Sequence, residues 1–157
     1  MPRTLTSPDA PSDLERFDLL IRLLKMGSLI NNPMKDGVCD PSGLSQIELK
    51  VIMALAGEGE LAGHELVRIM GVPAMNVSRA IAALLEAGLI EEIADPDNRR
   101  RKPVRLSEDG RAAYARMMPD IAEVAKALLG ELTARQRREF ASAADVVIAA
   151  MARWKNS

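Results

Sequence analysis

The stretch "HELVRIMGVPAMNVSRAIAALLEAG", residues 64–88, has the pattern of two helices joined by a tight turn. Its apolar residues recur at intervals of three and four, which is the spacing of one buried helix face. Gly71 suits the left-handed residue that ends a helix, and Pro73 suits the first turn of the next helix. The second helix is therefore predicted at residues 73–87, with Gly88 as its stop. Its buried face is expected to hold Val77, Ile81 and Leu84.

A hairpin of two short strands is predicted directly after these helices. "LIEEIA", residues 89–94, and "KPVRLS", residues 102–107, can each alternate inward and outward side chains. "DPDN", residues 95–98, supplies the Asp, Pro and Asn that turns favour. The four consecutive cations from Arg99 to Lys102 therefore fall at or just beyond the exposed end of the hairpin.

Outside this region, three capping-box patterns predict helix starts: Ser12/Glu15, Ser45/Glu48 and Thr133/Gln136. The first of these helices should run to about residue 28. Residues 31–43, which collect Pro, Gly, Asn and Asp, are predicted to form a loop. The second helix should end in "GEGE", residues 57–60. Ser107 is expected to cap a long helix that breaks near Pro119.

The order helix, helix, turn, helix, hairpin is that of a winged helix-turn-helix. The fold class is therefore predicted as mainly α with a small β-hairpin wing and with dimerisation helices at both ends. The apolar faces of the two terminal helices are broader than a 157-residue monomer of this layout can cover, which indicates a homodimer. A flexible N-terminus, an N-terminal dimerisation helix with its loop, a winged helix-turn-helix lobe and C-terminal dimerisation helices are assigned to residues 1–12, 13–43, 44–106 and 107–157.

Composition excludes several kinds of site. The single Cys39 cannot form an internal disulfide, the single His64 cannot build a structural zinc site, and there is no Gly-rich phosphate loop. We therefore predict no metal, no cofactor and no enzyme activity. No apolar run approaches the roughly 18 residues that span a bilayer, which predicts a soluble, cytoplasmic protein without membrane contact. The net charge is −1, so a polyanionic partner would have to meet a local patch such as the arginine cluster.

These predicted elements suit double-stranded DNA. The helix at residues 73–87 could enter the major groove, where its alanines permit close approach; the alternative is an amphipathic helix with an ordinary polar face. The hairpin cations could reach phosphates or a narrow minor groove; the alternative is a solvated tip. The candidate DNA-binding residues are Pro73, Ala74, Met75, Asn76, Ser78, Arg79, Asn98, Arg99, Arg100, Arg101 and Lys102.

From about Leu44 to Gly110 the chain resembles the MarR family of bacterial transcription regulators. The resemblance rests on "LSQIELKVIMAL", "GVPAMNVSRAIAALLEAGLIEE" and "DPDNRRRKPVRLSEDG", the last of which is similar to the family's wing signature. It implies a homodimer with interlocked terminal helices, a recognition helix at residues 73–87 and a wing arginine, Arg100, in the minor groove. The family's usual wing Asp is replaced by Asn98, whose neutral amide cannot pair electrostatically with a neighbouring arginine.

The same resemblance implies a small-molecule effector, often an aromatic acid, bound between the dimerisation helices and the DNA-binding lobe. Arg16, at the edge of the first helix's apolar stripe, could hold a carboxylate or could form a salt bridge. His64 could contact the effector or simply occupy a helix end. Cys39 could be an oxidation sensor, although its expected position in a loop favours a thiol without a role.

Together these features predict a dimeric, sequence-specific transcriptional regulator, and specifically a repressor that an effector releases from a pseudo-palindromic, inverted-repeat operator. Activation in place of repression would depend on where the operator lies relative to the promoter. The rival hypothesis is a winged-helix module that uses its basic hairpin on an acidic protein partner. Sequence-specific DNA binding with a steep salt dependence would favour the regulator.

Overall fold

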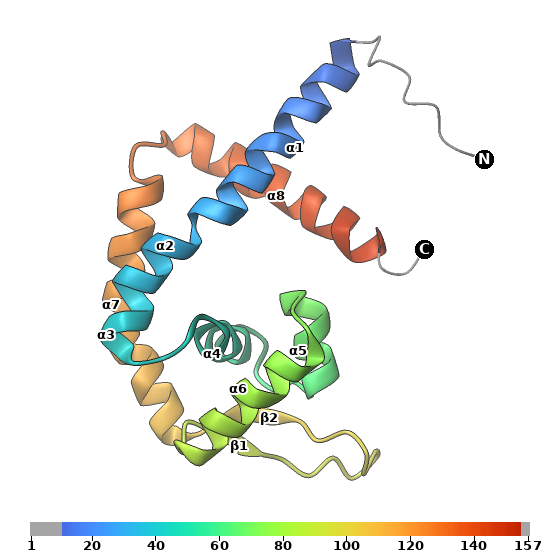
Figure 1. The fold of residues 1–157 in the computed structure, drawn as a ribbon, viewed down its shortest axis with the longest axis vertical. Helices are drawn as coiled ribbons and strands as arrows, with labels where there is room; N and C mark the ends of the chain where they lie inside the picture. Colours follow the sequence, from blue (N-terminus) through green and yellow to red (C-terminus); the bar gives the residue numbers. More distant parts are fainter. Residues whose placement is uncertain (1–10, 155–157) are drawn as a thin grey trace, which may run out of the picture.

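The computed structural model describes residues 11–154, which form two groups of elements (Figure 1). The lower group in that view holds α4 (Gln46–Glu58), α5 (Gly63–Met70), α6 (Ala74–Glu86), β1 (Ile90–Glu92) and β2 (Val104–Leu106). The upper group holds α1 (Pro11–Leu29) and α8 (Ala134–Trp154), and α7 (Glu108–Leu129) runs between the two groups. The predicted class, mainly helical with a two-stranded hairpin, is confirmed.

The lower group has one hydrophobic core, built from the faces that the sequence pattern predicts. Leu49, Ile52 and Leu55 recur along α4 and are almost fully buried. Fully buried side chains of α5 and α6 meet them, and the ends of both strands close the core. Leu61, in the loop after α4, exchanges two backbone hydrogen bonds with Val104 of β2, with N···O distances of 3.1 and 2.9 Å. The hairpin is therefore attached to the helices by its base.

Two of the three predicted capping boxes are confirmed. The Ser45 hydroxyl accepts from the Glu48 N–H at 3.1 Å while the Glu48 carboxylate accepts from the Ser45 N–H at 3.2 Å. The Thr133 and Gln136 pair makes the same two bonds. At the N-terminus the prediction is wrong, because α1 already begins at Pro11 and Ser12 lies inside its first turn, where proline is well tolerated. Residues 1–10 of the predicted flexible segment lie outside the described residues.

The loop predicted at residues 31–43 is wrong. This segment is helical to Ser42, as α2 (Asn31–Met34), a π-helical turn η1 (Lys35–Cys39) and α3 (Asp40–Ser42), and Gly43 ends it with φ 74°. Val38 and Cys39 are buried in the core, and η1 lies so close to α7 that a Cβ on Gly37 would overlap the side chain of Val124. Burial and tertiary packing outweigh the low helix propensity of the segment.

The break predicted near Pro119 is also wrong, because α7 continues through it. Met117, Ile121 and Val124 recur at four and three residues, and all three pack against the core on both sides of the proline. Pro119 itself is exposed, so water can satisfy the carbonyl group that its missing N–H leaves without a partner. The hydrophobic contacts of the helix therefore outweigh one lost hydrogen bond.

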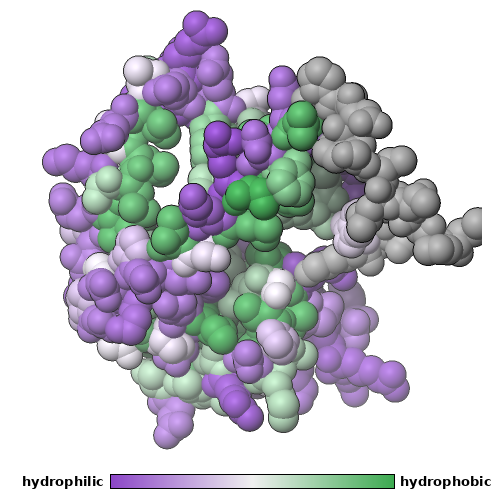
Figure 2. Space-filling model, turned by 45° about the horizontal axis from the view of Figure 1, so that its top comes forward, coloured by the Kyte–Doolittle hydropathy of each residue, from purple (hydrophilic) through white to green (hydrophobic). Residues whose placement is uncertain are grey.

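The upper group leaves broad apolar faces uncovered. Of the twenty large hydrophobic side chains that are exposed in the described residues, eight lie on α1 and six on α8. No described residue of α8 is buried. Figure 2, which brings this end of the molecule forward, shows apolar side chains at the surface between polar ones. Among residues 11–154, no helix has the length and hydropathy needed to cross a membrane.

Candidate nucleic-acid interface

Helix α6 and the proline before it carry one of the two groups of predicted contact residues. Val77, Ala80 and Leu84 hold one face of α6 against the core, and Ile81 at the edge of that face is partly buried. The predicted contact residues lie outside this buried face: Pro73, Ala74, Met75, Asn76, Ser78 and Arg79. All of them are exposed except Asn76, which is half-buried. Small side chains such as Ala74 and Ser78 keep the N-terminal half of this exposed face narrow, and Arg79 is its charged group. A narrow face is what close approach to base edges in the major groove requires.

The start of α6 differs slightly from the sequence prediction. Gly71 ends α5 with φ 66°, as predicted, but Pro73 precedes α6 as its N-cap residue with φ −57° and ψ 143°. The Pro73 carbonyl accepts from the N–H groups of Asn76 and Val77 at 3.0 and 3.3 Å. Because Pro73 has no N–H and an extended ψ, the chain leaves the turn in one defined direction.

A turn made by two polar side chains forms the tip of the hairpin. Asp95 Oδ1 accepts from the N–H groups of Asp97 and Asn98 at 3.0 and 3.2 Å. Asn98 Oδ1 accepts in the same way from the N–H groups of Arg100 and Arg101 at 3.1 and 3.3 Å. The amide at position 98 therefore organises the turn through its oxygen, and needs no negative charge to do so.

The four clustered cations do not share one environment. Arg99, Arg100 and Lys102 are exposed, and within residues 11–154 no salt bridge engages them. Arg101 instead donates from Nε to Glu65 Oε1 of α5 at 2.7 Å and from Nη1 to Asp95 Oδ2 at 3.3 Å. Its side chain is 27% exposed. The cluster thus divides into three cations directed to solvent and one that is paired within the protein.

Glu65 and Asp95 were missed as site residues by sequence reasoning. Asp95 was recognised only as a turn residue, and Glu65 carries no local signal, because its partner lies 36 positions away. The hydrogen bond from Arg101 Nε holds the pKa of Glu65 below its usual value. The pKa of Asp95 is lowered first by the N–H of Asp97 and then by Arg101. Both carboxylates are therefore stabilised in the charged form.

These lowered pKa values predict how the hairpin responds to pH. A carboxylate whose pKa is depressed by folding contributes stability that is complete above its unfolded value and is lost as the pH falls through the folded value. We expect the amide NMR signals of Asn98, Arg100 and Arg101 to be constant from pH 8 to pH 5.5, and to shift only below about pH 4, under the ordinary glutamate pKa of roughly 4.3. A transition between pH 5.5 and 8 would contradict this assignment.

The two residues considered for an effector are not brought together. Arg16, on α1, forms a salt bridge with Asp13 at 2.9 Å and is largely exposed. His64 is exposed at the start of α5, with Nε2 3.8 Å from Glu65 Oε1. Within the described residues no hydrogen bond joins Arg16 to His64. Arg16 thus lies in a salt bridge and His64 lies at a helix end, which are the alternatives to an effector contact.

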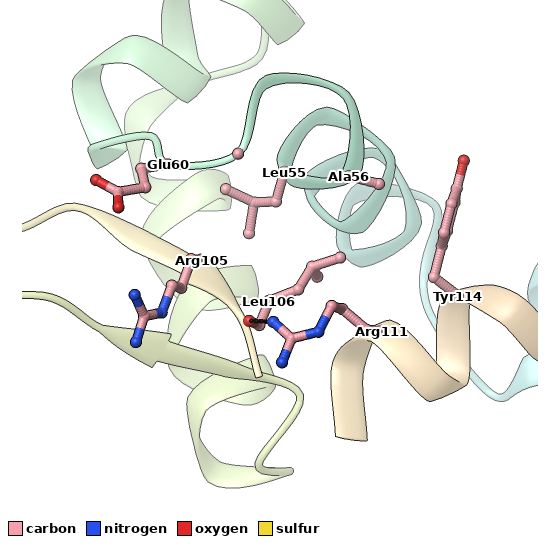
Figure 3. A pocket seen from close by; sticks show the side chains of 8 residues that line it. Leu55, Ala56, Glu60, Arg105, Leu106, Arg111 and Tyr114 are labelled. Atoms are coloured by element: carbon pink, nitrogen blue, oxygen red, sulfur yellow. Dashed lines mark hydrogen bonds between the residues drawn. The ribbon is translucent and has the colours of Figure 1, made fainter. Parts of the chain in front are cut away.

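A separate pocket of about 500 Å³ opens at the root of the hairpin (Figure 3). Its lining combines apolar side chains with two guanidinium groups: Leu55, Ala56, Gly59, Glu60, Arg105, Leu106, Arg111 and Tyr114. Arg111 Nη1 donates to the Leu106 carbonyl at 3.1 Å, and Arg105 Nε donates to Glu91 of the neighbouring strand at 2.8 Å. In Figure 3 the Tyr114 hydroxyl points away from both guanidinium groups. The pocket borders both β2 and the first turns of α7.

Cys39 is only 3% exposed, in η1 and not in a loop. Burial raises the pKa of its thiol, which lowers the fraction of reactive thiolate. Both properties agree with a thiol without a redox role. In the part of the chain that is described, no three His, Cys, Asp or Glu side chains cluster as a metal site would require.

Comparison with known proteins gives one consistent result. Residues 42–101 match the sequence model of the MarR family. The chain is similar to the HTH-type transcriptional repressor NicR of Pseudomonas putida, with 25% identity over 144 residues that cover 87% of this chain and 89% of the relative. It is also similar to an HTH-type transcriptional repressor of Mycobacterium tuberculosis, with 27% identity over 75% of this chain and 84% of the relative.

Solved structures support the fold. A MarR family transcriptional regulator from Silicibacter pomeroyi superimposes with a TM-score of 0.80 at 18% identity, over 93% of this chain and 97% of that one. The reduced form of MarR from E. coli superimposes with a TM-score of 0.65 at 19% identity, over 82% of this chain and 95% of that one. At these identities the likeness establishes the winged helix-turn-helix architecture.

Proposed function

We propose, since the chain belongs to the MarR family of transcriptional regulators, that it is a homodimeric repressor that binds an inverted-repeat operator in double-stranded DNA and is released by a small-molecule effector. This function requires access to the chromosome, and we therefore propose that the protein acts in the cytoplasm. The curated relatives named as repressors support repression over activation.

One arrangement carries this function: the slim exposed face of α6 lies in the same small lobe as a hairpin that presents unpaired cations. On α6 the proposed base-reading residues are Asn76, Ser78 and Arg79, with Pro73, Ala74 and Met75 at the approach. On the hairpin Arg99, Arg100 and Lys102 are proposed to meet phosphates or the minor groove, with Asn98 holding the turn. Because the chain as a whole carries a net charge of −1, attraction to a polyanion such as DNA would come from this local concentration of cations and not from the overall charge.

The uncovered apolar faces of α1 and α8 support the homodimer. A two-fold axis between two copies would set two α6 helices against successive turns of one face of the duplex, about 34 Å apart. An isologous interface of this kind explains why the operator should be an inverted repeat.

The effector is the part of the proposal that depends most on the family. The pocket at the root of the hairpin offers two guanidinium groups beside apolar side chains, which suits a small carboxylic acid better than the separated Arg16 and His64 do. It borders both the wing strand and α7, so a bound molecule could favour one relative arrangement of them. An acid that acts there should weaken operator binding less in Arg111→Gln than in the parent.

Operator binding is tested by fluorescence anisotropy with DNA from upstream of the protein's own gene and with a scrambled duplex. We expect the upstream DNA to bind more tightly, with log affinity falling linearly as log salt rises. Arg79→Ala should reduce the preference for upstream over scrambled DNA, since a bidentate base contact is worth about 1–3 kcal/mol. Arg100→Ala should weaken both duplexes and flatten the salt slope by about 1.

Arg138→Ala, on α8 in the upper group, is the control and should leave both parameters unchanged. Weak binding of both duplexes with equal affinity, together with tight binding to an acidic protein, would favour the rival hypothesis of a protein-interaction module.

A further inference from the structure

Arg101 differs from its neighbours in that it is directed into the protein. We propose that Arg101 is a positioning residue, which fixes the wing relative to the recognition helix through Glu65 and makes no contact with DNA itself. The proposal deepens the function proposed above and rests on it for its DNA-binding consequence, although the fixing of the wing can be measured without DNA.

The contacts of Arg101 leave it poorly suited to a phosphate. Two carboxylates from two different elements accept from its guanidinium, Glu65 at 2.7 Å and Asp95 at 3.3 Å, and their side chains are 26% and 17% exposed. If Arg101 turned towards a phosphate, both carboxylates would lose their partner close to a polyanion. Because charge-assisted pairs in partly desolvated sites are stronger than exposed ones, the paired arrangement should persist in the complex.

The hairpin needs such an anchor because its ladder is short. β1 and β2 pair over only three residues each, from Ile90↔Leu106 to Glu92↔Val104. Beyond that ladder one further backbone bond, from the Ile93 N–H to the Pro103 carbonyl at 2.9 Å, closes the base of the tip. A long two-stranded extension without helix contacts would be marginally ordered in water. Among the described residues, the Arg101–Glu65 bond is the side-chain link between this tip and α5.

The tip is a hydrogen-bonded unit that moves with Arg101. Asp95 and Asn98 each accept two backbone N–H groups within it, and Arg101 closes the unit by donating to Asp95. Arg99 and Arg100 lie inside this unit, so the direction of both exposed arginines is set where Arg101 meets α5. Since α5 packs against α6, anchoring the tip to α5 also fixes the wing relative to the recognition helix.

Glu65→Gln gives the sharpest test, because positioning and direct contact predict opposite signs. If Arg101 bound a phosphate, removing a nearby negative charge would strengthen DNA binding. If Arg101 positions the wing through Glu65, operator binding should weaken by about tenfold in Glu65→Gln and in Arg101→Ala, the double variant should be no weaker than either, and all three should keep the parent's salt slope.

The matched control is the second ion pair of the same hairpin. Arg105 and Glu91 face each other across the strands at 2.8 Å, and both are about half exposed. Glu91→Gln, which leaves the pocket-lining Arg105 in place, should change operator affinity by less than about twofold, as expected for an exposed pair. Arg101→Lys, which keeps the charge but not the fork of donors, should recover part of the loss.

A measurement on the free protein separates this proposal from the function on which it rests. Spin labels at Asp97→Cys and Glu86→Cys report the distance between the wing tip and the end of α6, with the buried Cys39 as background control. We expect a narrow distance distribution in the parent that broadens in Arg101→Ala and Glu65→Gln but not in Glu91→Gln. A distribution that stays narrow, or a salt slope that falls by about 1 in Arg101→Ala, overturns the proposal. Absence of operator binding in the parent, with broadening in the variants, would overturn only the proposed function.

Discussion

Phe140→Glu is expected to convert the proposed homodimer into a monomer and to lower operator affinity by at least about a hundredfold, because two linked half-sites bind far more tightly than one. Phe140 begins the apolar stripe of α8 and is 47% exposed in the single chain. In a two-fold interface the substitution would bury two carboxylates, one from each copy, in apolar surroundings without cations to pair with them. Sedimentation velocity measures the first effect and fluorescence anisotropy the second.

The control for this substitution lies two residues along the same helix. Ser142 is exposed and lies about 200° around α8 from Phe140, so Ser142→Glu adds the same charge to the opposite face. It should leave both the dimer and operator binding unchanged. The far-ultraviolet circular dichroism of Phe140→Glu should match the parent, since no described residue of α8 belongs to the core. A Phe140→Glu protein that remains dimeric at micromolar concentration would contradict the assignment of this face.

The lower group of elements could be predicted from the sequence because its signals are local. The Ser45 and Glu48 capping box needs contacts only within one turn, and the left-handed Gly71 needs only its own conformational freedom. The buried face of α6 follows from the spacing of Val77 and Leu84, and that spacing also assigns the opposite face to solvent. The exposure of the candidate base-reading residues could therefore be predicted for the same reason as the core.

The errors at residues 31–43 and at Pro119 fall where distant contacts override local preference. Residues 31–43 contain the residue types of a loop, but Val38 and Cys39 are buried and Gly37 packs against α7, whose contact residue is 87 positions away. The continuity of α7 through Pro119 likewise depends on the packing of its apolar face against the hydrophobic core. No local pattern contains these contacts, because each requires the other element to be in place.

The arginine cluster combines both cases. Its position at the end of a hairpin follows from turn-forming residues nearby, so the concentration of charge was correctly located. The sequence does not indicate which of the four cations is paired within the protein. Four adjacent cations look equivalent in the sequence, and only the folded chain brings Glu65 of α5 to one of them. Arg101, which the sequence pattern groups with the predicted DNA contacts, is thus, within residues 11–154, the one of the four cations that salt bridges hold to other parts of the protein.

Gly110→Ala is expected to destabilise the protein by about 3 kcal/mol, at the upper end of what an added methyl group costs in a packed site. A Cβ at this position would overlap the backbone carbonyl oxygen of Leu89. Two hydrogen bonds hold the two segments together, and a third fixes Gly110 to Ser107 within the start of α7. The Ser107 N–H donates to the Leu89 carbonyl at 3.0 Å, the Ser107 hydroxyl donates to the Gly88 carbonyl at 2.6 Å, and the Gly110 N–H donates to the Ser107 hydroxyl at 3.0 Å.

Relief of this overlap must therefore break the N-cap of α7 or displace the start of β1. Both of these join the wing to α7, the helix that leads to the upper group of elements. A loss of that size lowers the melting temperature by about 6–12 °C in a chain of this length, which thermal unfolding at one fixed protein concentration would detect. Gly57→Ala, in α4, is the matched control: a Cβ there meets nothing within 4 Å. In Gly57→Ala the gain in helix propensity should stabilise the protein by roughly 0.5–1 kcal/mol. Equal melting temperatures for Gly110→Ala and the parent would mean that α7 and β1 do not approach each other as closely as this contact requires.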